Sequence, residues 1–553
     1  MANKDNDKVK LNSSSESVTL PIKMYSQVIL NKCTVNKGTE DEFVCAGYKR
    51  NYFKTFLYYF LGIVTGGFGF LLGYWNPVQK LKFTHKPCAL SKASSVLIEQ
   101  IDERLFVSEV IMLDMESYSR RYGPTSDEKG TDVCPFEQQL LSMGRIEVFQ
   151  HMFLTYYWDP AVYTFIELSG LENKLSVQDI YKLSQGISES TRTVKQLLYG
   201  VNQINVPIKP FVLLFVQMAA DPFYIFQAFS CALWFVDDYA EYSGAILGIS
   251  LLSLFISTYE TRKHLKNLQK MVAKSCPVQV LQRKDSESIV ITKSSSELVP
   301  GDILVIPPEG MDMQCDAVLL SGRVIVNESS LTGESFPTTK TPVDNINVGK
   351  DELFDTQYSI KEHKRHSVYN GTHIVQARFY GGDARILAMV IRTGFCSLKG
   401  RLIRSIIHPK PVHFQFFRDS FKFIMILFLL AIGGFIYSVV IFVQWGESTP
   451  MIVKKALDVI TLIIPPALPT AMAIGIVYAL RRLKAHDIYC IDPPRINVCG
   501  KIKLFVFDKT GTLTEDSLAV SSVLPVEGGQ FQREACTVDD LGDSQILKGM
   551  DLV

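Results

Sequence analysis

A seven-residue segment near the end of the chain combines a carboxylate, an amine, a glycine and hydroxyls: Asp508-Lys-Thr-Gly-Thr-Leu-Thr514. It follows the apolar run 501–507, which has the character of a β-strand. Ligands of open α/β sheets bind at the carboxyl ends of strands, and a carboxylate there can attack the γ-phosphate of ATP to form an acyl phosphate. Phosphoryl transfer needs Mg²⁺ and nearby donors. We expect Mg²⁺ at Asp508 and Thr510, and phosphate or nucleotide contacts from Lys509, Thr510, Gly511 and Thr512. The alternative is an ordinary Asp-Lys turn.

The apolar stretch 456–480 contains three prolines within five consecutive residues, 465–469. Proline removes helical hydrogen bonds and frees backbone carbonyls, and broken helices near the membrane midplane are how transporters build ion sites. Asp458 lies two helical turns earlier on about the same face, and an acid inside a span is costly and usually functional. A kink needed only for packing is the alternative. The residues predicted to form a transport site are Pro465, Pro466, Ala467 and Asp458.

Four long apolar stretches predict four membrane spans, since about 20 apolar residues cross a bilayer as a helix. Acids stand at the turn between the first two spans, and basic residues follow the second and fourth, which predicts a cytosolic N-terminus and a cytosolic return after each pair. A further stretch, 55–79, has basic residues on both flanks and Gly66-Gly67 in its middle. We therefore expect a re-entrant hairpin there, with a true span as the alternative. The predicted spans are 223–236 (after a shorter stretch, 211–220), 242–259, 423–443 and 456–480.

The region between the second and third spans has short β-branched runs separated by Pro-Gly, Pro-Pro and Ser-Gly pairs, which predict a mostly β domain. Its expected strands include 289–292, 303–306, 317–320 and 324–326. Residues 86–206 mix helical and strand patterns and offer no chemistry of their own. The β domain carries the segment Leu331-Thr-Gly-Glu334-Ser, which by itself is a common surface turn.

The composition narrows the class of protein. Hydrophobic residues make up 47% of the 553 residues and charged residues 20%, which suits a chain that is partly membrane and partly soluble. Lys+Arg (57) nearly balance Asp+Glu (56), so we expect no nucleic-acid partner. The eleven cysteines form no CxxC pair, and the histidines form no HExxH pattern. Reduced thiols are therefore expected, with neither a disulfide framework nor a zinc site.

The segment beginning at Asp508 resembles the phosphorylation motif of P-type ATPases, whose phosphorylation domain is of the haloacid-dehalogenase class. Leu331–Ser335 resembles their actuator loop, so the resemblance makes Glu334 the residue that orients the water for dephosphorylation. Val299-Pro-Gly-Asp302 is similar to a structural turn of the same domain. Pro465-Pro-Ala-Leu-Pro469 resembles subgroup B of the type V enzymes, whose members are similar to polyamine exporters of late endosomes and lysosomes.

The resemblance implies a multidomain membrane protein. Its α-helical transmembrane bundle has four spans plus a re-entrant hairpin, with a mostly β actuator domain and the first strand of a haloacid-dehalogenase-like α/β phosphorylation domain. It also implies that the chain stops before most of its nucleotide machinery. The expected divisions are an N-terminal tail (1–50), the hairpin (51–80), a cytosolic domain (81–209), two spans (210–260), the actuator domain (261–418), two spans (419–482) and the start of the phosphorylation domain (483–553).

Two functions remain open. The first is ATP-driven transport of a cation, most of all a polyamine, across an endosomal or lysosomal membrane through an aspartyl phosphate, with Mg²⁺ and ATP as cofactors. The second is a non-catalytic membrane protein that binds anionic lipid at the N-terminal hairpin or regulates a partner, since the 553 residues alone are expected to be inactive. A soluble phosphatase of the same superfamily is disfavoured by the four predicted spans.

The nucleophile assignment predicts the outcome of one substitution. In the complete protein, Asp508→Asn abolishes the acid-stable, hydroxylamine-labile phosphoenzyme formed from ATP, because the amide keeps the shape but cannot attack phosphorus. The measurement is incorporation of labelled phosphate. Label that persists on the substituted protein contradicts the assignment.

Overall fold

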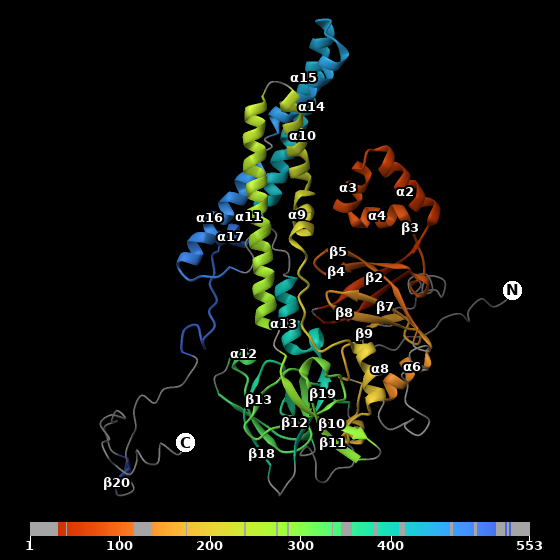
Figure 1. Ribbon diagram of the computed structural model, residues 1–553, viewed down its shortest axis with the longest axis vertical. Helices are drawn as coiled ribbons and strands as arrows, with labels where there is room; N and C mark the ends of the chain where they lie inside the picture. The colour runs from red at the N-terminus through yellow and green to blue at the C-terminus, as the bar shows by residue number, and fades with distance from the viewer. Residues whose placement is uncertain are drawn as a thin grey trace, which may run out of the picture.

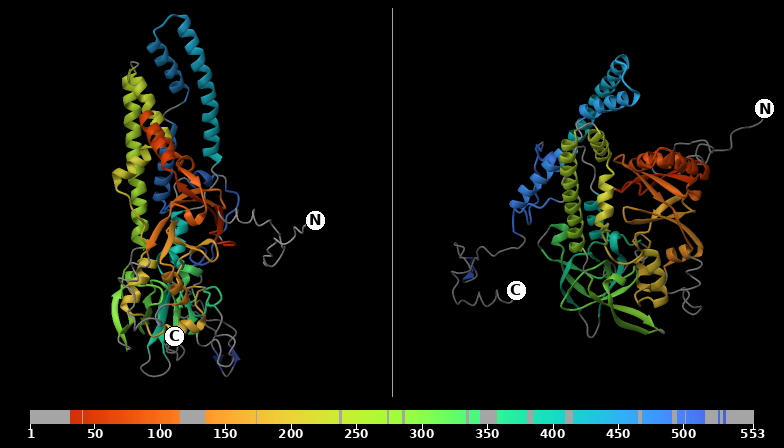
Figure 2. Two further views of the ribbon diagram at one scale, coloured as in Figure 1. Left: turned by 90° about the vertical axis from the view of Figure 1, so that its right-hand side faces the viewer. Right: turned by 45° about the horizontal axis from the view of Figure 1, so that its top comes forward.

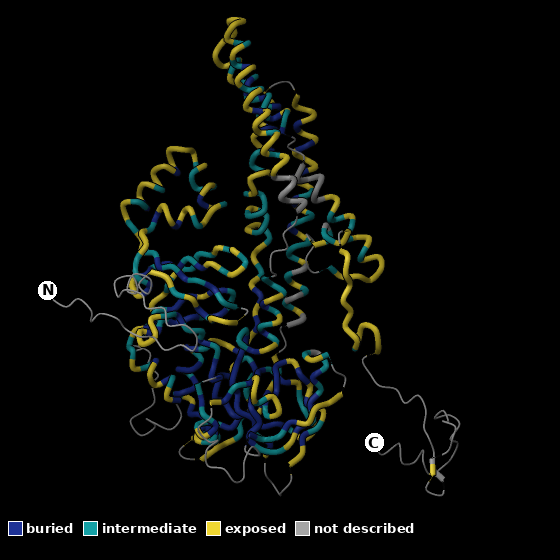
Figure 3. The backbone as a smooth tube through the Cα atoms, turned by 180° about the vertical axis from the view of Figure 1, so that it is seen from behind, coloured by how far each residue is buried: buried dark blue, intermediate teal, exposed yellow. Residues whose placement is uncertain are grey.

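The computed structural model is elongated, with β-sheets at one end and apolar helices rising toward the other (Figure 1). It describes residues 31–39, 41–114, 134–172, 174–236, 239–272, 275–284, 287–333, 336–343, 357–379, 385–408, 415–464, 468–490, 495–500, 502–515, 526–527 and 530–531. Figure 3 shows that buried residues concentrate in the sheets, whereas the hairpin and the upper helices are largely exposed.

Two antiparallel sheets form the N-terminal part. One has the order β1-β2-β4-β5 with β3 added to β2, and the other has the order β6-β7-β8-β9. Phe43, Ile98, Phe149, Tyr156 and Phe165 bury their side chains between them. The domain boundary expected at residue 50 therefore falls inside a sheet, because strand 43–50 pairs with strand 95–100 across the hairpin. The strands are β1 (Lys32–Val35), β2 (Phe43–Arg50), β3 (His85–Pro87), β4 (Ser95–Gln100), β5 (Leu105–Glu109), β6 (Ile111–Asp114), β7 (Arg145–His151), β8 (Leu154–Asp159) and β9 (Thr164–Glu167).

Three short helices between β2 and β3 turn back on themselves: α2 (Tyr52–Val64), α3 (Phe68–Trp75) and α4 (Pro77–Thr84). The side chain of Asn51 caps α2, and Gly66 and Gly67 take φ of 62° and 95° where the chain reverses. At 13 residues, α2 is too short to cross a bilayer. The glycine pair thus breaks the helix as expected, and the segment has the shape of a hairpin. Its depth in a membrane stays a prediction.

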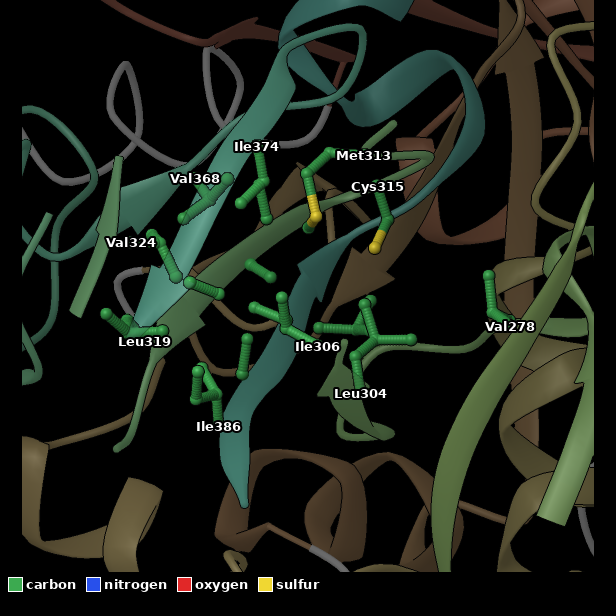
Figure 4. Close-up of a cluster of buried hydrophobic side chains, with 14 of the residues drawn as sticks. Val278, Leu304, Ile306, Met313, Cys315, Leu319, Val324, Val368, Ile374 and Ile386 are labelled. Atoms are coloured by element: carbon green, nitrogen blue, oxygen red, sulfur yellow. The ribbon is translucent and has the colours of Figure 1, made fainter. Parts of the chain in front are cut away.

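A β domain follows helix α11 (Ala240–Val272), as the sequence predicts. Its two sheets have the orders β11-β10-β12-β19-β14-β17 and β13-β18-β15-β16. They enclose a core that includes Leu304, Ile306, Val324, Ile374 and Ala388 (Figure 4). The strands are β10 (Pro277–Lys284), β11 (Glu287–Ser294), β12 (Ile303–Ile306), β13 (Met311–Asp312), β14 (Asp316–Leu319), β15 (Arg323–Asn327), β16 (Thr338–Lys340), β17 (Ser367–Val368), β18 (His373–Arg378) and β19 (Ile386–Arg392).

Helices from the preceding region pack on this β domain: α6 (Pro135–Ser142), α7 (Val177–Lys182) and α8 (Glu189–Tyr199). Leu171 and Ile180 share a core with Val318 and Met389 of the β domain. The expected division into residues 81–209 and 261–418 therefore does not separate two cores. Apolar faces from both stretches are buried against each other, and the sequence pattern alone does not show which stretch covers which.

A buried charge cluster joins α8 to the β domain. Arg192 pairs with Asp302 at 2.5 Å, and Lys195 pairs with Glu137 at 2.9 Å while donating to the carbonyl of Pro300 at 3.1 Å. Asp302 also accepts the backbone N–H of Val299 at 2.9 Å. The Val299–Asp302 turn thus has the structural role that the sequence predicts.

The apolar helices stand away from the sheets: α9 (Phe211–Ala219), α10 (Pro222–Val236), α11 (Ala240–Val272), α14 (Gln415–Gln444), α15 (Thr449–Ile463) and α16 (Leu468–Ala485), with α13 (Leu398–Ile407) below α14. Two stretches, Ala240–Asn267 and Lys422–Gln444, are long and apolar enough to cross a membrane. The pair α9 and α10, bent by 73°, is a third candidate if it counts as one span. The fourth predicted span is divided between α15 and α16, and stays a prediction because residues 465–467 lie outside the described residues.

The hairpin lies beside the bend between α9 and α10 (Figures 1 and 2). Trp75 of α3 donates its indole N–H to the carbonyl of Ala220 at 2.6 Å. A helix break leaves backbone carbonyls without intrahelical hydrogen-bond donors. Here a side chain of the hairpin donates a hydrogen bond to one of these carbonyls. The hairpin and the bent pair are therefore in direct contact.

The buried pair between Arg192 and Asp302 predicts a large stability effect. Arg192→Met removes the charge but keeps an apolar stem, so Asp302 stays buried without its partner and the β domain loses about 3–5 kcal/mol of unfolding free energy. The measurement is pulse proteolysis of the full chain across a urea series. Lys182→Met is the control, because its pair with Asp179 is exposed and is worth less than about 1 kcal/mol. Equal urea midpoints for the two variants would contradict the role of the cluster.

Candidate functional site

Asp508 stands at the start of a tight loop. The backbone N–H of Lys509 donates to Oδ1 of Asp508 at 2.8 Å, and the carbonyl of Lys509 accepts the N–H groups of Leu513 at 2.9 Å and Thr514 at 3.0 Å. Gly511 takes φ of 73°, which allows the chain to close on itself without strain. The loop exposes the Asp508 carboxylate, as a nucleophile requires.

The run before Asp508 is not a strand, contrary to the sequence prediction. Residues 502–508 have extended-chain sequence character but no ladder partner within the described residues, and Leu504 and Val506 are 79% and 88% exposed. A strand of a parallel sheet needs at least one partner strand and cover on both faces. Sequence propensity identified a chain segment suited to a strand, but propensity without a partner strand does not form one.

The actuator-like loop reaches Asp508 from the β domain. The short helix α12 (Ser329–Thr332) ends at Gly333, which takes φ of 73°. A β-carbon built on Gly333 lies 3.6 Å from Oδ2 of Asp508 and 4.0 Å from Oδ1. Figure 1 shows the chain after α17 (Ile496–Cys499) descending to the level of α12. Two motifs far apart in the sequence therefore meet, while Glu334 and Ser335 lie outside the described residues.

Two residues that the sequence analysis did not single out hold this loop. The carbonyl of Glu328 accepts the N–H groups of Leu331 and Thr332, each at 2.9 Å, and so starts α12. The buried carboxylate of Glu328 pairs with Lys340 at 2.7 Å and accepts the hydroxyl of Thr338 at 3.2 Å. The charge pair ties α12 to the neighbouring strand β16. The available sequence signal was an acid two residues after the β-branched run 324–326.

The loop after Asp508 has donors for a phosphate but few ligands for a metal. Lys509, Thr510, Gly511 and Thr512 all lie in it, next to the carboxylate. Mg²⁺ takes six oxygen ligands and usually keeps several waters, so the Asp508 carboxylate and an oxygen of Thr510 fit as its protein ligands, with water and phosphate oxygens completing the set. Among the described residues, no group of three or more His, Cys, Asp or Glu side chains gathers to hold a metal without a substrate.

The predicted transport site centres on a buried acid. Asp458 in α15 is 8% exposed, and its Oδ1 accepts the indole N–H of Trp234 from α10 at 3.1 Å. Thr461, fully buried one turn later, accepts the same N–H at 3.1 Å. The buried contact joins two of the apolar helices, α10 and α15. Trp234 was missed, because nothing in the sequence indicates which aromatic residue faces an acid more than 200 positions away.

The helix is interrupted where the prolines predict it. α15 ends at Ile463 and α16 begins at Leu468. Pro465, Pro466 and Ala467 lie between the two helices and outside the described residues. The unwinding expected at the prolines therefore stays a prediction, and Asp458 lies about two helical turns before Pro465 in the sequence.

An actuator-like β domain inserted between apolar helices, with its loop against the aspartate of a phosphorylation motif, defines the class of the P-type ATPases. Residues 274–407 match the model of the P-type ATPase actuator domain, and residues 39–159 match that of the P5-type ATPase cation transporters. Over these matched residues the chain is similar to the P5-type ATPases, and its relatives point to subgroup B.

Similar proteins carry names of transporters. The chain is 40% identical over 512 residues to mouse (Mus musculus) polyamine-transporting ATPase 13A3, a match that covers 90% of this chain and 42% of that protein. It is 38% identical over 513 residues to human (Homo sapiens) polyamine-transporting ATPase 13A2, covering 88% and 42%. Chicken (Gallus gallus) probable cation-transporting ATPase 13A4 is 37% identical over 509 residues, covering 90% and 41%. The chain thus spans about two fifths of the length of these relatives.

The proximity of the two motifs predicts a specific cross-link. In the full chain with Gly333→Cys and Asp508→Cys, copper phenanthroline joins the two introduced thiols, because the backbone at 333 directs a β-carbon at residue 508. The measurement is mass spectrometry of the linked peptides. The control pair is Gly322→Cys with Asp508→Cys, since the nearest atoms to a β-carbon at 322 belong to Ile386 and Arg378. Equal yields from both pairs would contradict the meeting of the motifs.

Proposed function

We propose that this chain is the actuator, membrane and nucleophile part of an ATP-driven pump that moves a cation, most of all a polyamine, through an aspartyl-phosphate intermediate. The observation that carries the proposal is the approach of the Gly333 loop to the Asp508 carboxylate. A loop that hydrolyses a phosphorylated aspartate must reach that aspartate. The residue after Gly333 is Glu334, which has the chemistry to orient and deprotonate water.

Two displacements at phosphorus make up the proposed reaction. In the first, an Asp508 oxygen attacks the γ-phosphorus of ATP, the bond to the bridging oxygen breaks, and ADP leaves. In this proposal Lys509 and the backbone around Gly511 neutralise charge on the transferred group. Asp508 and Thr510 would hold Mg²⁺, which would supply further charge neutralisation. In the second, Glu334 takes a proton from a water that attacks the phosphorus, which releases phosphate and restores Asp508.

The cargo assignment rests on Asp458 and on the names of the relatives. A carboxylate buried among apolar helices is costly unless it meets a cation or hydrogen-bond donors. Trp234 and Thr461 donate to one side of this group, and an ammonium can compete for the same oxygens. We expect the prolines that follow α15 to free backbone carbonyls for the same site. We propose Asp458 with Pro465, Pro466 and Ala467 as the transport site, and late endosomes or lysosomes as the location.

A lipid-binding role has its own supporting observation. The hairpin exposes Tyr52 and Phe53, at 83% and 76%, and a cavity of about 570 Å³ beneath it is lined by Arg50, Lys80 and His85. Exposed aromatic residues above cationic side chains fit a membrane surface with anionic headgroups. We propose this as a second property of the pump, and as the main function if the pump assignment fails.

Substitutions of Asp458 and of a control acid, Asp487, test whether the transported cation is a polyamine. In the complete protein, ATPase activity rises with spermine or spermidine more than with Ca²⁺, K⁺ or Na⁺. Asp458→Asn raises the half-saturating spermine concentration about tenfold or more, because a charge-assisted hydrogen bond of about 1.5–3 kcal/mol is lost. Asp487→Asn, a like change in an exposed turn after α16, leaves that concentration unchanged.

The outcomes of this test distinguish the polyamine assignment, the pump assignment and the lipid-binding role. Stimulation by Ca²⁺ alone contradicts the polyamine assignment but leaves the pump assignment intact. A complete protein that forms no phosphoenzyme at Asp508 under any cation contradicts the pump assignment. Retained binding to anionic vesicles in that case supports the lipid-binding role.

A further inference from the structure

Two thiols face each other across neighbouring strands of the N-terminal sheet. β1 and β2 run antiparallel, and their register places Cys33 directly opposite Cys45. Directly opposed residues in antiparallel strands have Cα atoms about 4.5–5.5 Å apart and side chains on the same face. A disulfide spans Cα separations of about 4.4–6.8 Å. The two strands therefore hold the thiols at bonding range without any rearrangement of the fold.

The two thiols differ in exposure. Cys45 is fully buried in the core that contains Phe43, Tyr156 and Phe165, whereas Cys33 packs against the same core but is only half-buried. An oxidant that arrives from solvent meets Cys33 first, and Cys45 lies behind it. This is the arrangement of a reactive thiol with a resolving partner.

The surroundings of Cys33 favour its thiolate. A hydrogen bond from the Cys45 side chain is the largest influence, and together with the Thr164 hydroxyl and the Phe165 backbone it outweighs burial and lowers the pKa of Cys33 to about 6. Burial raises the pKa of Cys45 well above its usual value, so that thiol keeps its proton. The thiolate is the nucleophilic form, and near neutral pH only Cys33 of this pair carries it.

We propose that Cys33 and Cys45 are a reversible thiol–disulfide site oxidised by hydrogen peroxide. The Cys33 thiolate attacks one peroxide oxygen, the O–O bond breaks, and the departing hydroxide takes up a proton to become water. This leaves a sulfenic acid on Cys33. The Cys45 sulfur then attacks the Cys33 sulfur, the S–O bond breaks, and the Cys45 proton leaves with the hydroxyl as a second water. The two thiols lose two electrons and the peroxide gains two.

The disulfide would close a ring of residues 33–45, and this ring contacts the helix that leads to the membrane helices. The ring contains Asp41, whose carboxylate pairs with Arg404 of α13. α13 follows the last strand of the β domain and precedes the membrane helix α14. Oxidation therefore acts on the segment that ties the N-terminal sheet to the connection between the β domain and the membrane helices.

Differential alkylation of the full chain tests the site. Membranes that contain the protein are treated with hydrogen peroxide, free thiols are blocked with iodoacetamide, and reduced disulfides are then labelled with an isotopic form. We expect Cys33 and Cys45 to become labelled together and to return to free thiols with dithiothreitol. Cys88 is the internal control: it packs against the same core and is half-buried, but burial raises its pKa. Oxidation of Cys33 no faster than that of Cys88 overturns the proposal.

Two substitutions separate the roles of the thiols. In Cys45→Ala, Cys33 loses the hydrogen bond that most lowers its pKa, so it oxidises more slowly. It then stops at the sulfenic acid, which dimedone traps, and no Cys33 disulfide forms. In Cys33→Ala, the buried Cys45 stays unmodified. A disulfide from Cys33 to another cysteine in the unsubstituted chain contradicts the pairing.

The pH dependence of alkylation tests the reactivity of Cys33 in the unsubstituted chain. This measurement does not depend on whether a substituted chain folds. The rate for Cys33 should reach half its maximum near pH 6, compared with about 8.5 for an ordinary cysteine. A midpoint above 8 overturns the assignment of Cys33 as the reactive thiol.

Discussion

The buried charge cluster around Arg192 and Asp302 fixes the relation between the N-terminal half and the β domain. Ionised groups out of water are costly unless each meets its partner with good geometry. Arg192 meets Asp302, and Lys195 meets both Glu137 and the carbonyl of Pro300. Two apolar surfaces can pack in several relative positions. These charge pairs form only when α8 and the β domain are in one relative position. The helices α6 and α8 are therefore docked on the β domain in a defined way.

That docking matters because the β domain presents the loop that reaches Asp508. Within the domain, the Glu328–Lys340 pair holds α12, and the left-handed backbone of Gly333 allows the chain to reverse beside the carboxylate. A rigid base with one reversing residue at its edge suits a loop that must approach a phosphorylated group closely. Buried charge pairs thus stabilise two places: the contact of α8 with the β domain, and the base of the loop that reaches Asp508.

A buried polar contact also joins the apolar helices, but here it involves a single charged group. Asp458 is held by the indole of Trp234 and sits next to Thr461, so a single acid joins α10 to α15. α15 ends shortly after it, at Ile463. An acid buried among apolar helices is tolerated only where it has hydrogen-bond partners or a ligand. The contact of Trp75 with Ala220 links the hairpin to the bend in the neighbouring pair.

The sequence by itself determined what depends on local chemistry. Alternation and turn residues gave the β domain, apolar length gave the candidate spans, the Gly66-Gly67 pair gave the break in the hairpin, and motif order gave the family. Tertiary structure decided what depends on partners. Strand 43–50 pairs across the hairpin, α8 packs on a domain expected to be separate, and residues 502–508 form no strand without neighbours. Trp234, Lys340 and the opposed Cys33 and Cys45 became visible only in space, because contacts between distant residues leave no period or spacing in the chain.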